Sequence, residues 1–484
     1  MQHRPSFGRR LCYGCIMTTL DKAEPVQTGM TSAGRGPVAA EFIETIRLAL
    51  PIALTQLGQI AMMTTDLALI GRLGDRAVAA ASLAHTVFFV AFVIGMGLVS
   101  AVAPLAAQAL GARQPRIVRR ALRVGLWAAL LLCIPMMLLP LFGEQILLIL
   151  GQSPENARLA QRYLLGLAPG MAPALCFMAI RNFMGAVNRP EPGLWITLAA
   201  IPANGLLGYA LIHGHWGLPK LELLGAGVAT TTVNFAMCAA ALWFTWCQRP
   251  FRKFHVLGHF WRIDWPLMKQ LVVIGAPIAM SFLLEYGLFS AAGLLMGLIS
   301  TTALAAHQIA LQIAAILFMV PFGIGMAATV RVGQAFGRGE RSAIRRAGFV
   351  AIILGIAFMS VMTLAVIVVR FDLARFFFGD GPQGLAAVEL AATLMLVGAT
   401  FFVADGIQTV AAGALRGLSD TRIPLLLAAV SYWAIGFTSA CAFAFQLNFG
   451  GVGVWIGLSI GTGLYAILLV LRFRGLTHRL KVAP

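Results

Sequence analysis

The 484-residue chain is 59% hydrophobic and only 11% charged, which is too apolar to cover a water-facing surface and excludes a soluble globular fold. Its apolar residues are gathered into runs of roughly 18–28 residues, long enough to cross a bilayer of about 30 Å. The net charge of +18 is spread over short loops, which argues against a nucleic-acid-binding face. The composition therefore predicts an all-α integral membrane protein.

The chain opens with a polar stretch, residues 1–44, that we predict to be a disordered cytoplasmic tail. It lacks an apolar run long enough for a signal peptide. Cys12 and Cys15 form one isolated C-x-x-C pair there, which is weak evidence for zinc or redox chemistry without a second pair. Met17 and Met30 are alternative start sites that the sequence leaves open.

Twelve apolar segments follow, and each is expected to be a transmembrane helix, because backbone groups in lipid must hydrogen-bond within their own segment. The expected spans are 46–71, 78–107, 121–142, 161–186, 193–212, 223–247, 270–298, 303–330, 348–369, 387–413, 424–446 and 451–471. They are grouped into a six-helix lobe at 45–247, a basic cytoplasmic linker at 248–268, a second six-helix lobe at 269–472 and a cytoplasmic tail at 473–484.

The basic residues indicate the orientation of these spans. With the amino terminus in the cytoplasm, 29 of the 36 Lys and Arg residues lie in segments on the inner side and 7 on the outer side. Cytoplasmic loops of membrane proteins carry such an excess. Both termini are therefore predicted to be cytoplasmic.

The chain also repeats itself at a constant offset of 226 in the numbering. The matching segments are Pro51–Ala53 with Pro277–Ala279, Gly71 with Gly297, Gln108–Gly111 with Gln334–Gly337, and Arg119–Ala121 with Arg345–Ala347. Each repeat holds an even number of spans, so both insert in the same orientation. We therefore expect two lobes related by a pseudo-two-fold axis along the membrane normal, an arrangement found in transporters.

Three of the 18 acidic residues lie inside the expected spans and away from their ends: Asp66 in the first, Glu285 in the seventh and Asp405 in the tenth. A charged carboxylate there is costly unless it faces water, a cation or a partner. Such an acid can hold a proton, a sodium ion or a cationic compound, but hardly two together, and antiport requires this competition. The alternative is a structural acid that hydrogen-bonds to backbone or pairs with arginine.

Several motifs carry a family resemblance. They are Gly275–Ile278 followed by Glu285, Ala305–Ile309, Phe318–Gly323, Arg331–Gln334, Asp405–Gln408 followed by Gly413–Gly417 and Asp420, and Thr65–Asp66 followed by Gly71 and Gly74. In order and spacing they resemble the multidrug and toxic compound extrusion (MATE) family, in its NorM-like bacterial branch. The resemblance covers about residues 45–475 and leaves out the amino-terminal tail.

The resemblance implies a twelve-helix, two-lobed antiporter of the bacterial inner membrane. Its relatives expel amphiphilic, often cationic organic compounds in exchange for Na⁺ or H⁺ by alternating access. No cofactor and no nucleic acid is expected, and we expect the chain to act as a monomer in the bilayer.

The resemblance also assigns roles to individual residues. It places Glu285 and Asp405 together as the cation-coupling site of the second lobe. In the first lobe it places Asp66 and Asn204 as a site that responds to protons or substrate. The candidate supporting residues are His307, Gln308 and Gln408. A bound metal is expected only as Na⁺ at Glu285 and Asp405.

Two positions depart from the family pattern. Relatives with a sodium site often have a tyrosine one helical turn before the acid of span ten, where this chain has Phe401. The lost oxygen ligand shifts the expectation toward protons without excluding sodium. Relatives also often carry two asparagines four residues apart in span five, whereas this chain has Ala200 and Asn204.

Other functions fit less well. A phosphate-binding loop G-x-x-x-x-G-K-[ST] is absent from the sequence, so ATP is not expected to drive transport within this chain. The motif H-E-x-x-H is absent from the sequence. G-x-S-x-G occurs once, at Gly457–Gly461, but it lies inside an apolar span rather than at a strand-to-helix turn, so an enzyme is not expected. The main alternative is a lipid-linked oligosaccharide flippase of the same superfamily, although the intramembrane acids and the count of twelve spans favour drug export.

Overall fold

The computed structural model describes residues 36–214, 217, 219–248, 251, 261–378 and 385–479, and every regular element among them is helical. Residues 1–35, which include Cys12 and Cys15, and residues 252–260 of the predicted linker lie outside this part of the chain. The protein is thus an all-helical, multi-pass membrane protein, as its composition predicts.

The first half of the chain forms ten α-helices. They are α1 (Pro37–Gly71), α2 (Asp75–Ser100), α3 (Val102–Gly111), α4 (Pro115–Met136), α5 (Leu138–Leu141), α6 (Gly143–Ile149), α7 (Pro154–Leu167), α8 (Met171–Ala186), α9 (Glu191–His213) and α10 (Glu222–Cys247). A short 3-10 turn, Ala168–Gly170, joins α7 to α8.

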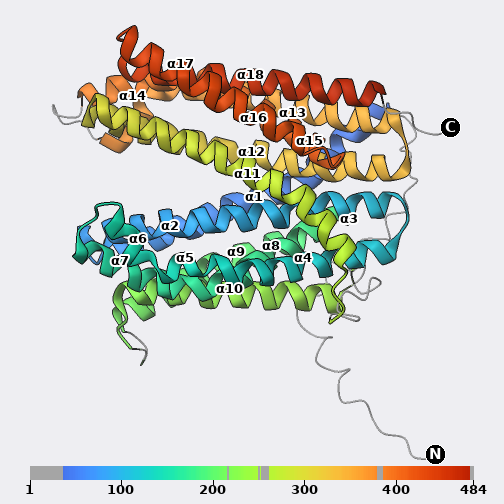
Figure 1. Cartoon of the computed structure of the whole chain (residues 1–484), viewed down its shortest axis with the longest axis horizontal. Helices are drawn as coiled ribbons and strands as arrows, with labels where there is room; N and C mark the ends of the chain where they lie inside the picture. The colour runs from blue at the N-terminus through green and yellow to red at the C-terminus, as the bar shows by residue number, and fades with distance from the viewer. Residues whose placement is uncertain are drawn as a thin grey trace, which may run out of the picture. The chain divides into compact units, whose positions relative to one another are not determined.

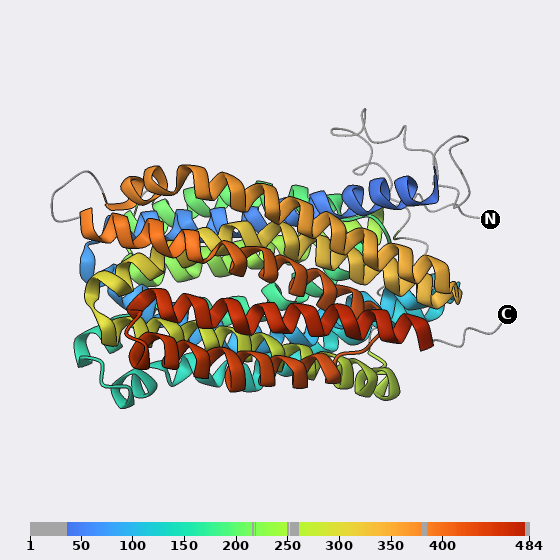
Figure 2. The ribbon, with the colours of Figure 1, turned by 90° about the horizontal axis from the view of Figure 1, so that it is seen from above.

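The second half begins at α11. Its elements are α11 (Trp265–Ile299), α12 (Thr301–Arg338), α13 (Arg341–Phe378), α14 (Leu385–Val397), α15 (Ala399–Gly417), α16 (Arg422–Ala428), α17 (Thr438–Cys441) and α18 (Gly450–Arg479). The π-helical segment Ala429–Phe437 joins α16 to α17, and a second one, Ala442–Gln446, continues the same helix beyond α17. The long helices of both halves lie roughly along the horizontal axis of the two ribbon views (Figures 1 and 2).

The described helices match the predicted spans closely. Ten are long and apolar enough to cross a membrane, and the pair α14 and α15, bent by 47° at Gly398, makes an eleventh. The predicted first span, 46–71, lies within α1, which begins at Pro37, so the last residues of the stretch predicted as a disordered tail are helical. α1 is not among these eleven, and it carries Glu41, Glu44 and Asp66 along its length. Four predicted spans are interrupted in the structure: the second at Ala101, the third at Met137, the fourth at the 3-10 turn Ala168–Gly170 and the tenth at Gly398.

The ribbons of the two halves approach each other at one end and lie apart at the other, where α6, α7 and α14 are found (Figure 1). Contacts between the halves join α12 to α3, α11 to α2 and α15 to α3. The end at which they meet carries the connections between α3 and α4, between α12 and α13 and between α15 and α16. The positive-charge pattern predicts that this is the cytoplasmic end.

Two close helix contacts at glycines connect the halves, and the offset of the repeat relates one contact to the other. A side-chain carbon on Gly97 of α2 would overlap the backbone of Ala279 on α11. A carbon on Gly323 of α12 would likewise overlap the backbone of Ala53 on α1. The offset of the repeat relates Gly97 to Gly323 and Ala53 to Ala279, so the two contacts are copies of one another. Small residues let membrane helices approach this closely.

We predict that Gly323→Val lowers the free energy of unfolding in detergent by about 1–3 kcal/mol, because the new side chain forces α12 and α1 apart. Gly463→Val in α18 is the matched control, since nothing lies within 4 Å of a carbon added there. Thermal unfolding followed by circular dichroism measures both variants. Equal melting temperatures would show that this close contact contributes nothing to stability.

Candidate ion-coupling site

The two acids of the second half are linked by one glutamine. The Nε2 of Gln408 donates to Glu285 Oε1 at 3.0 Å and to Asp405 Oδ1 at 2.8 Å. Glu285 lies on α11, whereas Asp405 and Gln408 lie one turn apart on α15. Asp405 and Gln408 are buried, and Glu285 is half-buried. A residue singled out in the sequence as supporting therefore holds the two predicted coupling acids together.

A tyrosine fixes the orientation of that glutamine. The hydroxyl of Tyr432 donates to Gln408 Oε1 at 2.6 Å, which leaves the amide nitrogen directed at the two carboxylates. Tyr432 lies in the π-helical segment Ala429–Phe437 and its ring contacts that of Tyr465 on α18, with centroids 5.0 Å apart. π-Helical segments frequently occur at functional sites, because the wider turn redirects side chains.

One arginine contributes positive charge to this site. The guanidinium of Arg416, on α15, lies 4.8 Å from the ring centroid of Phe282 on α11, and its charge acts on Glu285. Within the described residues, this site thus combines two carboxylates, one amide, one hydroxyl and one cation.

His307 and Gln308 take other positions. His307 is fully buried and its Nδ1 accepts a hydrogen bond of 3.2 Å from Trp455 Nε1. The ring of Trp455 also contacts Phe401, with centroids 5.6 Å apart, so Phe401 belongs to an aromatic cluster. Gln308 lines a cavity of about 670 Å³ between α11 and α12, together with apolar residues such as Leu304. His307 and Phe401 thus share contacts with Trp455 rather than with Glu285, Asp405 or Gln408.

Asp66 has a separate set of partners in the first half. Its Oδ1 accepts a hydrogen bond from Asn204 Nδ2, and its Oδ2 accepts one of 3.0 Å from Thr230 Oγ1. These residues come from α1, α9 and α10. Asn204 is fully buried and Asp66 is 9% exposed. The fold therefore brings Asp66 and Asn204 into contact, and their predicted role in responding to protons or substrate stays a prediction.

Sequence reasoning missed Tyr432, Arg416 and Thr230. Tyrosine is rare in this chain, with six in 484 residues, so a tyrosine inside a span was a usable signal for Tyr432. Arg416 lies in the motif Gly413–Gly417, which contributed to the family resemblance, but the sequence analysis predicted no role for the arginine. Thr230 is the first of three consecutive threonines, and only the packing of α10 against α9 shows which of them reaches Asp66.

Comparison with known proteins agrees with this architecture. The model of the MatE family matches residues 51–210 and again residues 277–442. The starting residues of the two matches are related by the offset of the repeat. A probable multidrug resistance protein NorM of Bradyrhizobium diazoefficiens is 61% identical over 464 residues, covering 96% of this chain and all of that protein. One of the same name from Rhodopseudomonas palustris is 58% identical, covering 90% of this chain and 92% of that protein.

The chain belongs to the MATE family. This is a family of transporters and not of enzymes. The crystal structure of the eukaryotic MATE transporter AtDTX14 has the same fold, with a TM-score of 0.82, 20% identity and coverage of 91% of this chain and 98% of that one. The predicted family and the predicted twelve-helix fold are therefore confirmed, whereas the predicted roles of the acids stay predictions.

For this MATE protein, we predict that Tyr432→Phe lowers the free energy of unfolding by about 1–3 kcal/mol, since it leaves the buried Oε1 of Gln408 without its donor. Tyr286→Phe is the matched control, because it removes a hydroxyl from a residue of α11 whose ring contact with Phe89 stays intact. Chemical unfolding in detergent micelles measures both. A Tyr432→Phe variant as stable as the control would contradict the role assigned to this hydroxyl.

Proposed function

We propose that this MATE protein is a proton-coupled antiporter that exports amphiphilic, often cationic organic compounds across the bacterial inner membrane. Two relatives that it matches at 61% and 58% identity bear the name multidrug resistance protein. The single observation that supports a coupling site is that Gln408 donates hydrogen bonds to both Glu285 and Asp405. The proposal includes cytoplasmic termini and a monomeric state.

Charge balance supports one exchangeable cation at this site. When both acids are ionised, Glu285 and Asp405 carry two negative charges, and Arg416 supplies one positive charge. One negative charge stays uncompensated in a buried environment, which is unfavourable. One proton, one sodium ion or the positive charge of a substrate would neutralise it. Only one of these can be accommodated without an excess of positive charge, so arrival of the ion favours release of a cationic substrate.

The polar groups around the acids favour a proton over sodium. Sodium requires several oxygen ligands, whereas Gln408 presents its amide nitrogen to both carboxylates. The oxygen of Gln408 is already occupied by Tyr432, and Phe401 offers none. Neighbouring carboxylates that share one donor are well suited to sharing one proton.

Transport requires that occupancy of this site changes how the two halves are arranged relative to the membrane. Glu285 lies on α11, which also contacts α2 of the first half. A ligand shifts a conformational equilibrium only through different affinities for the two states. We infer that proton or substrate occupancy at the acids changes the packing of α11 and so biases which side of the membrane the protein opens to. Asp66, with Asn204 and Thr230, is a second responsive site in the first half.

We predict that Glu285→Gln and Asp405→Asn each abolish gradient-driven export of a cationic dye, because neither variant can exchange a proton at the altered position. Export falls at least about tenfold, as for loss of a positioned proton-transfer group. Glu389→Gln in α14 is the matched control, since this acid is exposed and belongs to the same half. Dye efflux from proteoliposomes measures the rates. Near-normal export by both site variants would refute the coupling role.

We predict that an imposed proton gradient drives export by the wild-type protein in proteoliposomes and that a sodium gradient at equal pH on both sides does not. The reason is that, among the described residues discussed above, Gln408 and Phe401 add no free oxygen ligand to those of Glu285 and Asp405. Dye fluorescence under each gradient applied separately measures the effect. Export driven by sodium alone would reverse the assignment of the ion, and binding of a lipid-linked oligosaccharide without any response to cationic dyes would favour the flippase instead.

A further inference from the structure

Among the described residues, side-chain hydrogen bonds between the two halves gather at one end of the molecule. They involve Gln108 of α3, Gln334 and Arg331 of α12, and their partners on the opposite half. This is the end at which the ribbons meet and which the charge pattern predicts to be cytoplasmic (Figure 1). A polar contact at that position must form and break if the halves alternate between two arrangements.

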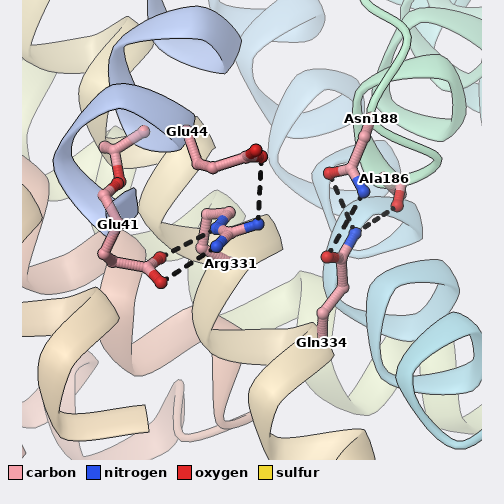
Figure 3. A network of polar contacts seen from close by, with 7 residues as sticks. Glu41, Glu44, Ala186, Asn188, Arg331 and Gln334 are labelled. Carbon is pink, nitrogen blue, oxygen red and sulfur yellow. Dashed lines mark hydrogen bonds and ion pairs between the residues drawn. The ribbon is translucent and has the colours of Figure 1, made fainter. Parts of the chain in front are cut away.

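Gln108 and Gln334 make equivalent bonds in opposite directions. Gln108 Nε2 donates to Gly417 O at 2.8 Å and to Ser419 Oγ at 2.9 Å. Gln334 Nε2 donates to Ala186 O at 3.0 Å and to Asn188 Oδ1 at 3.1 Å (Figure 3). In each case a glutamine of one half binds the last carbonyl of a helix and the side chain two residues later in the other half.

The acceptors of the two glutamines also share a backbone conformation. Asn188 has φ 60° and Ser419 has φ 58°, both in the left-handed region, and each follows the end of its helix by two residues. A helix end leaves carbonyls without partners inside the helix. The carbonyls of Ala186 and Gly417 therefore accept from the glutamine of the opposite half. The two sets of acceptors are not related by the constant offset of the repeat, so the sequence does not reveal their equivalence.

Glycines bring the two glutamines within reach. A carbon added to Gly111 would overlap the carbonyl oxygen of Gln334, and one added to Gly337 would overlap that of Gln108. Gly111 and Gly337 are themselves related by the offset of the repeat. The carboxyl ends of α3 and α12 thus cross at backbone contact, with one glutamine on each side of the pseudo-two-fold axis.

A third polar contact at this end has no counterpart at the corresponding position of the other repeat. Arg331 forms a two-pronged ion pair with Glu41, at 2.8 and 2.9 Å, and a longer one of 3.5 Å with Glu44 (Figure 3). At the offset of the repeat, Arg331 corresponds to Leu105, which cannot form such a pair. The glutamines, which are present in both repeats, are therefore the symmetric polar element of this interface.

We propose that Gln108 and Gln334 form an interlobe glutamine pair that holds the cytoplasmic ends of the halves together, and that both must release for the protein to open toward the cytoplasm. Uncharged hydrogen bonds suit this purpose because water replaces them when the interface opens, so one net bond shifts an equilibrium only roughly two- to tenfold. The proposal rests on the alternating-access function proposed above.

The test measures how often the interface opens, without any transported compound. Ala107 is fully buried and would contact a carbon added to Gly333, so Ala107→Cys places a thiol inside the interface. In a background free of other cysteines, the rate at which a charged maleimide modifies this thiol in inside-out vesicles reports the opened population. We expect Gln108→Leu and Gln334→Leu each to raise this rate roughly tenfold, and the double variant to raise it more than either.

Two controls separate opening of the interface from loss of structure. Gln161→Leu also removes bonds to two backbone carbonyls, those of Pro140 and Leu141, but within the first half, and it should leave the rate unchanged. The native Cys133, buried within the first half, serves as the only thiol in a parallel set of variants and should be modified no faster. An unchanged rate at residue 107, or an equal rise at Cys133, would overturn the proposal.

The converse experiment tests the requirement for release. Cysteines placed at Gln108 and Ser419 and joined by a short bifunctional maleimide should arrest dye export, whereas each single cysteine treated with the same reagent should not. Continued export by the cross-linked protein would show that release is not required. Failure of the untreated wild-type protein to export dye would contradict the proposed function instead, and it would leave the modification rates at residue 107 as an independent measure of the glutamine pair.

Discussion

In the apolar interior of a membrane, a charged or polar side chain has no water and must find its partner within the protein. The three intramembrane acids follow this constraint in two different ways. Asp66 is satisfied by an asparagine and a threonine from two neighbouring helices. Glu285 and Asp405 instead share one amide donor, which leaves them short of positive charge. Asp66 thus has two neutral donors for one carboxylate, whereas Glu285 and Asp405 divide one amide donor between two carboxylates.

The two halves share their packing but not their charged sites. The glycine contacts between α2 and α11 and between α12 and α1 are copies at the offset of the repeat, and so are the two glutamines at the closed end. At the same offset Asp66 corresponds to Ala292, and Glu285 corresponds to Gln59. In the mechanism proposed above, the symmetric interface lets the halves rock against each other, and the asymmetric acids restrict ion coupling to particular helices.

Close packing of the helices connects the symmetric interface with the asymmetric acids. Interfaces with backbone contact at glycine tolerate little intermediate separation, because packed surfaces are bistable rather than continuously deformable. α11 carries Glu285 near its middle and contacts α2 nearer its beginning, at Ala279. A change in the charge at Glu285 can therefore act on the interface along a single rigid helix. Asp405 lies on α15, which is bent by 47° from α14 at Gly398, and its link to Glu285 of α11 runs through the side chain of Gln408.

The sequence by itself determined the helical spans, the repeat, the family and the acids inside the membrane. These follow from runs of apolar residues, from segments at a fixed offset and from the rarity of charge in lipid, all of which are local or periodic properties. Only the tertiary structure decided that Gln408 joins Glu285 to Asp405, that Tyr432 orients it, that Thr230 reaches Asp66, and that Gln108 and Gln334 bind the opposite half. Most of these contacts join residues that lie far apart in the sequence, and side-chain direction on packed helices, rather than any pattern along the chain, selects the partners.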